Sequence, residues 1–315
     1  MVQSRKTSLA LRLGAVLLVV AVVEAAIRLS GITDFPAYAV DDELGYVVKP
    51  NQSGHFLVKN SWSFNSKSMP TAVEWNPSAH PNILLIGNSI VMGGNPYDQQ
   101  DKLTTMLTSN LGGAYQIWPA AIGGWTNVNE MAYLRRNPDV VKVANFFVWE
   151  YMSGGLSGPN SWAGDYVFPS YRPVWATGYV FRRYVLPHVI NLKLNELPPV
   201  GDLKDNYLKD FETSIAELSR SSKLPHPGLI FLYPTKKELL FAKQGGEWLH
   251  EKAALVKVCD EFGLKLIDVA ANEAWNASLY RDSVHPTVQG NAVLATILSS
   301  AIAETLAPPS QRSSR

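Results

Sequence analysis

The sequence has a single cysteine, Cys259, among 315 residues. One cysteine excludes an intrachain disulfide and argues against a zinc site built from thiolates. The neighbouring residues 256–262 follow a helical pattern, so we expect a buried structural thiol there. None of the six histidines forms a metal-ligand cluster with another histidine or with the cysteine at suitable spacing. We therefore expect neither a metal ion nor any other cofactor.

The chain also lacks an excess of charge of one sign, since its net charge is only +1. No basic stripe accompanies the aromatic residues, which excludes nucleic acid as an expected partner. Low-complexity sequence is absent except for the polar tail at 307–315, which we predict to be disordered. The length suffices for one sizeable α/β domain with extensions.

Long hydrophobic runs are scarce, and the only prominent one covers residues 13–23. Three basic residues precede it: Arg5, Lys6 and Arg12. One interpretation is a cleaved signal peptide, because residues 23–25 resemble a small-residue cleavage site. The other is an uncleaved membrane anchor at 9–29, with Arg12 reaching back to the interface. Both interpretations assign residues 1–30 to targeting and place the body outside the cytoplasm, in the periplasm or beyond.

The remainder of the chain predicts a connector followed by one α/β domain. Residues 31–80 are loop-rich, and we expect them to pack on the main domain, residues 81–306. There, short apolar runs at 83–86, 115–119, 140–148, 229–233 and 265–269 alternate with helical patterns near 98–111, 126–136, 204–222, 246–262 and 287–306. This alternation predicts a three-layer α/β/α sandwich with a mainly parallel, flavodoxin-like sheet of about five strands. A site would lie beyond the carboxyl ends of the strands.

Residues 151–200 interrupt the alternation with a segment rich in aromatic residues. A connection of this length usually carries elements of its own or has a function. Its rings either form a local core or make a wall that stacks on sugar faces.

Two motifs supply the parts of a serine nucleophile and its base. Ser89 follows the predicted strand at 83–86, at a turn where its Oγ can be exposed and its N–H can face an oxyanion. Val91 breaks the pattern of an α/β-hydrolase elbow. Asp282 precedes His285 by three residues and can orient the imidazole so that its Nε2 accepts the serine proton. Taken singly, each residue is equally compatible with an ordinary turn or cap.

The motifs Gly87-Asn88-Ser89, Gly123-Gly124 and Asp282-x-x-His285-Pro286 together resemble those of the SGNH/GDSL hydrolase superfamily, over roughly residues 80–306. The resemblance implies that Ser89 is the nucleophile and that Asp282 and His285 complete a triad. It also implies that the N–H groups of Ser89 and Gly124 form the oxyanion hole. The N-terminal helix is similar to that of membrane-tethered members.

The sequence departs from the family pattern in two blocks. Asn88 stands where aspartate is usual, which is a common variation. Glu150 stands where the family has the asparagine that donates to the oxyanion. A protonated Glu150 could donate that hydrogen bond, whereas an ionised one would repel the oxyanion. Asn127 and Asn145 are the alternative donors.

We therefore expect a serine esterase or O-acyltransferase that acts on O-acyl esters, O-acetyl above all, of an extracytoplasmic polysaccharide. Trp125, Trp149 and Tyr151 are the expected substrate-binding residues. Two alternatives remain open at this point: an inactive carbohydrate-binding or assembly protein that retains the fold, and a lipid-directed esterase.

Overall fold

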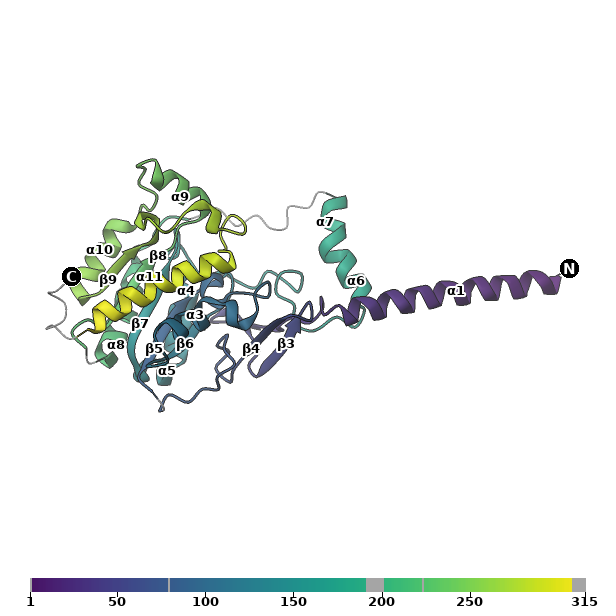
Figure 1. Cartoon of the computed structure of the whole chain (residues 1–315), viewed down its shortest axis with the longest axis horizontal. Helices are drawn as coiled ribbons and strands as arrows, with labels where there is room; N and C mark the ends of the chain where they lie inside the picture. The colour runs from purple at the N-terminus through teal and green to yellow at the C-terminus, as the bar shows by residue number, and fades with distance from the viewer. Residues whose placement is uncertain (1, 79, 191–200, 223, 308–315) are drawn as a thin grey trace.

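The structure is a computed structural model that describes residues 2–78, 80–190, 201–222 and 224–307, with the backbone alone for residues 2–10. Helix α1 (Val2–Leu29) opens the chain and projects away from the body (Figure 1). Within the part of the chain that the structure describes, no helix is both long and apolar enough to cross a bilayer. The predicted anchor begins at residue 9, so its first side chains lie outside the described part, as does the predicted disordered tail from residue 308.

The connector consists of two antiparallel hairpins. The first pairs β1 (Tyr38–Asp41) with β2 (Gly45–Val48), and the second pairs β3 (Gln52–Phe56) with β4 (Asn60–Phe64). Their inward side chains, among them Tyr46 and Trp62, are buried and belong to the same hydrophobic core as the main domain. The connector thus packs on the main domain through apolar burial.

The main domain contains a sheet of five parallel strands in the order β6-β5-β7-β8-β9. The strands are β5 (Asn82–Gly87), β6 (Gln116–Ala121), β7 (Ala144–Tyr151), β8 (Gly228–Leu232) and β9 (Lys265–Asp268). Every residue of β5 and of β8 is buried, as expected for strands covered on both faces. The order is that of flavodoxin-like sheets, so the predicted fold class is confirmed for the sheet domain.

Helices form a layer on each face of the sheet. On one face α3 (Leu103–Asn110) packs against α11 (Val288–Leu306) and α2 (Ser89–Met92), next to the 3₁₀ turn η1 (Gln99–Asp101). On the other face α8 (Asp205–Ser222) contacts α4 (Asn127–Arg136), α5 (Pro138–Val143) and α10 (Lys252–Phe262). Connections between parallel strands are right-handed, so the direction in which the chain moves across the sheet decides which face each helix covers. After β6 the chain moves across the sheet in the opposite direction, and the helices that connect the later strands therefore lie on the other face.

Shorter elements complete the chain. Helix α9 (Lys236–Lys243) follows β8, and two 3₁₀ turns, η3 (Val269–Ala271) and η4 (Ala277–Leu279), follow β9. The aromatic-rich insertion contains α6 (Ala176–Val180), a π-helical turn η2 (Phe181–Val185) and α7 (Leu186–Val189). Figure 1 shows these three as one rod beside the carboxyl end of α1.

Two predicted boundaries were wrong, and one helix was not predicted. Residues 140–143 form the end of α5 rather than a strand, because Pro138 occupies the first turn of a helix and fixes its φ there. The helix predicted over 246–262 begins only at Lys252. Helix α9 was missed, although Thr235 and Glu238 form a capping box at its start. Cys259 is buried in α10, where a structural thiol was expected.

Candidate active site

Ser89 is the first residue of α2, directly after the tight turn that follows β5. Asn88 caps the helix, since its side-chain oxygen accepts a hydrogen bond from the Ile90 N–H at 3.1 Å. A side chain at Gly87 would approach a Glu150 carboxylate oxygen to 2.3 Å, so the turn leaves no room for a larger residue. The sharp change from strand to helix presents the Ser89 hydroxyl at the carboxyl edge of the sheet.

The structure brings Ser89, His285 and Asp282 into one hydrogen-bonded row. The Nε2 of His285 lies 3.0 Å from the Oγ of Ser89. Its Nδ1 lies 3.1 and 3.0 Å from the two carboxylate oxygens of Asp282. Because the carboxylate can only accept, it holds a proton on Nδ1 and leaves Nε2 free to accept from the serine. The sequence spacing predicted the contact of Asp282 with His285, and the family resemblance joined them with Ser89.

Hydrogen bonds hold the loop that carries His285 on several sides. The hydroxyl of Tyr233, just beyond β8, donates to the carbonyl oxygen of Val284 at 2.9 Å. The hydroxyl of Tyr97 donates to the carbonyl oxygen of Pro286. The N–H of Lys236 donates to the carbonyl oxygen of Ser283 at 2.9 Å. A loop fixed in this way keeps the imidazole within reach of Ser89 without a conformational search.

Asp282 is ionised over the whole neutral range. Partial burial raises its pKa, but hydrogen bonds from the backbone N–H groups of His285 and Val284 outweigh that effect and lower the pKa to about 2. Both N–H groups donate to the same carboxylate oxygen, at 2.8 and 2.9 Å. The negative charge that orients and stabilises a protonated His285 is thus permanent above acidic pH.

Two backbone N–H groups are available to an oxyanion. Neither the Ser89 N–H nor the Gly124 N–H has a hydrogen-bond partner among the described residues, and both residues line one cavity. Gly124 has a φ of +84°, a left-handed conformation that favours glycine. The N–H groups that the family resemblance implied therefore lie beside the cavity.

The orientation of the Gly124 N–H is set from outside the sheet domain. The hydroxyl of Tyr46, in the connector, donates to the carbonyl oxygen of Gly123 at 3.0 Å. In a trans peptide the N–H points opposite to the carbonyl, so this bond points the Gly124 N–H away from Tyr46. The side-chain amide of Asn160 donates to the carbonyl oxygen of Gly124 at 2.6 Å and holds the next peptide. Sequence analysis missed both Tyr46 and Asn160.

Glu150 does not face the cavity. It lies inside β7 rather than after it and is 1% exposed. One of its carboxylate oxygens accepts from the Asn88 N–H at 3.1 Å, and the other is buried without a partner among the described residues. The expected role of Glu150 as an oxyanion donor is therefore wrong. Its contact instead supports the turn that carries Ser89.

The two asparagines that were considered as substitutes also do not supply a free donor. Asn127 lines the cavity, but its side-chain amide donates to a carboxylate oxygen of Glu130 and to the carbonyl oxygen of Glu150, both at 2.8 Å. Those two bonds use both amide hydrogens. Asn145 lies at the opposite end of β7, where it accepts from the Asn82 N–H at 2.7 Å. Neither asparagine therefore offers a free amide hydrogen to the cavity, whereas the N–H groups of Ser89 and Gly124 have no partner among the described residues.

Two buried carboxyl groups lie beneath the site. Burial raises the pKa of Glu130 to about 8, although the Trp149 and Asn127 side chains donate to it and oppose the shift. Burial raises the pKa of Glu150 well above its ordinary value, and the neighbouring Glu130 raises it further. Burial therefore disfavours the ionised form of both groups, and a charge on either one would disfavour a charge on the other.

Of the three expected substrate-binding residues, two belong to the core. Trp149 and Tyr151 are 0% exposed, and both rings pack on Phe211 of α8. Their predicted role was wrong because β7 is covered on both faces, so no side chain of this strand meets solvent at the site. Trp125 does line the cavity, but it is 3% exposed and its indole N–H donates to the carbonyl oxygen of Tyr46 at 3.0 Å.

The cavity beside Ser89 has a volume of about 200 Å³. Most of the side chains that line it are small and polar, from Thr126, Asn127, Ser153, Ser157, Asn160 and Thr235 among others, while apolar lining comes from Met152, Val284 and Trp125. A short acyl group fits such a volume, and a hydroxyl-rich molecule finds hydrogen-bond partners on these walls.

No protein-family model matches the chain, and no curated protein matches it. Among solved structures, the chain is similar to a psychrotrophic esterase from Pseudoalteromonas sp., at 10% identity and a TM-score of 0.44, over 70% of this chain and 96% of that one. It is similar to a carbohydrate acetylesterase family member from Sinorhizobium meliloti, at 14% identity and a TM-score of 0.37, over 71% and 98%. It is also similar to a member of the lipolytic G-D-S-L family from Veillonella parvula, at 13% identity and a TM-score of 0.39, over 70% and 96%.

Proposed function

We propose that this protein is a serine esterase of the SGNH type that cleaves short O-acyl esters. The observation that carries the proposal is the row Ser89–His285–Asp282, with His285 Nε2 at 3.0 Å from Ser89 Oγ. A serine, a base in reach of it and an acceptor that orients the base are the parts that acyl transfer through a serine ester requires.

The proposed reaction has two halves. Ser89 Oγ attacks the acyl carbon while His285 accepts the hydroxyl proton at Nε2, and the N–H groups of Ser89 and Gly124 stabilise the oxyanion. The imidazolium then gives that proton to the departing alcohol oxygen as the ester bond breaks. In the second half His285 takes a proton from an incoming hydroxyl, which attacks the acyl-enzyme and releases Ser89. Water as this nucleophile makes the protein an esterase, and a sugar hydroxyl makes it an acyltransferase.

We further propose an acetylated carbohydrate as the substrate class. The small volume of the cavity favours an acetyl group over a long acyl chain, and the serine, threonine and asparagine side chains among its lining residues can bond to the hydroxyl groups of a carbohydrate. These features disfavour the alternative of an esterase for long-chain lipids. Because Glu150, Asn127 and Asn145 do not supply the side-chain donor that the family asparagine provides, we expect a modest rate, since one such donor contributes about 10²–10³-fold.

The test is hydrolysis of an aryl acetate and of an acetylated polysaccharide by the full-length chain in detergent, next to Ser89→Ala. We expect activity on acetyl esters that falls by at least about 10³-fold in the variant. Ser221→Ala is a matched control, because Ser221 lies on the exposed side of α8 with its hydroxyl bonded to Glu217. Equal activity of Ser89→Ala and wild type would refute the serine mechanism. Carbohydrate binding without acetyl-ester cleavage by either protein would favour the binding-module alternative.

We also propose that α1 anchors the protein in a membrane, with the body outside the cytoplasm. Support comes from the run of large apolar side chains on α1, nine of which lie 41–75% exposed between Leu11 and Val23. A membrane-impermeant maleimide applied to intact spheroplasts of an expression host would test it with Phe241→Cys, on the exposed surface of α9. We expect labelling before lysis. Labelling only after lysis would place the body in the cytoplasm.

A further inference from the structure

A second group of exposed apolar side chains lies at the foot of α1. We call residues 171–190 the arm; it contains α6, η2 and α7. Eight of its large apolar side chains are 41–87% exposed: Tyr171, Val174, Trp175, Phe181, Tyr184, Val185, Val189 and Ile190. Soluble surfaces seldom leave so many apolar side chains in one place, and such a patch marks a surface that contacts something else.

The arm is fastened to α1. The carboxylate of Glu24, in the last turns of α1, accepts hydrogen bonds from the N–H groups of Ala176 and Thr177 and from the Thr177 hydroxyl, each at 2.8 Å. Arg28 pairs with Glu24 and also donates to the carbonyl oxygen of Val174. Figure 1 shows the α6–α7 rod crossing the axis of α1 steeply. A helix that crosses a membrane-spanning segment in this way lies along the membrane surface.

The charges of the arm have one sign. Between residues 166 and 190 the sequence has three arginines, at 172, 182 and 183, and no aspartate or glutamate. Arg172 pairs with Asp34 at 2.8 Å. Arginine next to exposed tryptophan, tyrosine and aliphatic side chains is the composition of segments that rest on anionic lipid surfaces.

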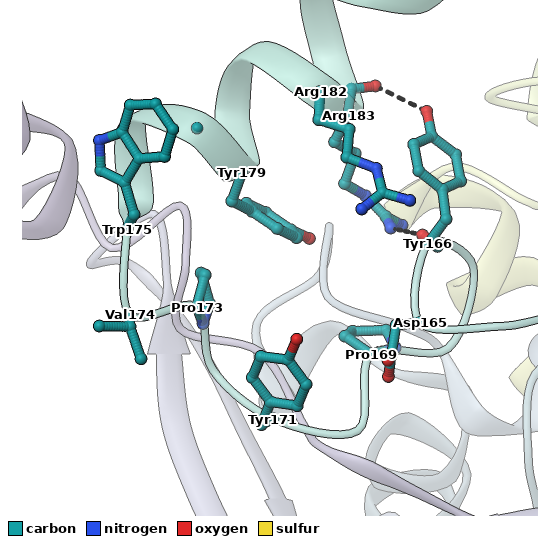
Figure 2. A pocket seen from close by; sticks show the side chains of 11 residues that line it. Asp165, Tyr166, Pro169, Tyr171, Pro173, Val174, Trp175, Tyr179, Arg182 and Arg183 are labelled. Carbon is teal, nitrogen blue, oxygen red and sulfur yellow. Dashed lines mark hydrogen bonds between the residues drawn. The ribbon is translucent and has the colours of Figure 1, made fainter.

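A pocket of about 490 Å³ opens beside the arm (Figure 2). Its lining includes the rings of Tyr171, Trp175 and Tyr179 and two prolines. Arg182 and Arg183 also line it, as does the carboxylate of Asp165, just before the arm. The guanidinium of Arg183 lies 5.6 Å from the ring centre of Tyr166 and 5.9 Å from that of Tyr179. Tyrosine and tryptophan rings with arginine between them are typical of the headgroup level of a bilayer.

We propose that the arm is a second membrane contact, which lies in the headgroup layer of an anionic bilayer at the foot of α1. Its exposed apolar side chains enter the boundary with the acyl chains, and Arg182 faces lipid phosphates. The proposal rests on the proposed anchoring by α1. Under this proposal the exposed apolar side chains of the arm contact lipid rather than a protein partner.

Depth-dependent quenching in vesicles of phosphatidylcholine and phosphatidylglycerol tests this. Full-length variants Val19→Cys, Val189→Cys and Phe241→Cys would each carry an environment-sensitive fluorophore, on α1, on the arm and on α9 respectively. The native thiol stays unlabelled, since burial raises the pKa of Cys259 to about 12. We expect nitroxides deep in the acyl region to quench the Val19 probe, nitroxides near the headgroups to quench the Val189 probe, and neither to quench the Phe241 probe, whose helix lies far from α1 in Figure 1.

The outcomes separate the two proposals. A quenched Val19 probe with an unquenched Val189 probe would leave the anchor in place and overturn the arm contact. No quenching at either position would refute both membrane proposals but not the esterase, which the acetate assay tests separately.

The role of charge is tested by Arg182→Gln beside Arg220→Gln on α8. Adding phosphatidylglycerol to the vesicles should increase the quenching of the Val189 probe. We expect Arg182→Gln to reduce this increase by about twofold or more, and Arg220→Gln to leave it unchanged. An unchanged increase in Arg182→Gln would overturn the contribution of Arg182.

Discussion

The hydroxyl of Tyr46 donates a hydrogen bond to the carbonyl oxygen of Gly123, across 77 residues of sequence. This bond orients the peptide whose N–H, on Gly124, faces the proposed oxyanion. A residue of the connector therefore controls the geometry of a donor in the sheet domain.

Replacing Tyr46 with phenylalanine should lower kcat by roughly 10-fold and leave KM nearly unchanged, because a misoriented donor is felt mainly in the transition state. Steady-state kinetics on an aryl acetate would measure the two constants. Tyr133→Phe is a matched control, since the hydroxyl of Tyr133 donates to the carbonyl oxygen of Lys67 at 2.9 Å, away from the cavity. Equal losses in the two variants would mean that Tyr46 acts only through stability.

Asp282→Asn should reduce kcat by about 10²–10⁴-fold, because an amide no longer holds the His285 tautomer that leaves Nε2 unprotonated. The amide oxygen can still accept from the N–H groups of Val284 and His285, so the loop and the melting temperature should change little. Kinetics and thermal unfolding together check this. A large fall in melting temperature would assign the loss to the loop rather than to the tautomer.

Glu150→Gln should keep kcat within about threefold of wild type at pH 7, because glutamine resembles the protonated carboxyl and still accepts from the Asn88 N–H. Glu150→Leu removes that acceptor and should lower kcat by roughly 10-fold or more while KM changes less. The pair of variants distinguishes support of the turn from acid–base chemistry. If Glu150→Gln were as slow as Glu150→Leu, a proton on Glu150 would be part of the reaction.

The buried Glu130 should make the free energy of unfolding decrease as the pH rises. Its folded pKa, about 8, is above its ordinary value of 4.5. Its contribution is complete below pH 4.5 and is lost progressively as pH rises through 8, at about 1.4 kcal/mol for each pKa unit. Chemical denaturation at several pH values should show this loss in wild type and a flatter profile in Glu130→Gln. A profile that is identical in both would remove Glu130 as the source.

Local patterns sufficed for the parallel sheet and for the contact between Asp282 and His285, whereas the family resemblance was needed to join them with Ser89. Short apolar runs between helical patterns indicated the strands, and the spacing of Asp282 and His285 indicated their contact. The aromatic residues of β7 could not be assigned in this way, because a strand buried on both faces has no alternation that distinguishes core from site. The contact of Tyr46 with Gly123 joins segments with no common pattern, so only tertiary packing reveals it.

The contacts of Glu24 with Ala176 and Thr177 have a consequence for how substrates are found. They make a stiff joint between α1 and the body, where a freely swivelling tether would otherwise be expected. With α1 inserted in a bilayer, such a joint presents Ser89 at one height and one angle above the lipid surface. The distance of an ester group from the bilayer then decides whether it can reach Ser89, before the chemistry of the cavity selects among the esters that do.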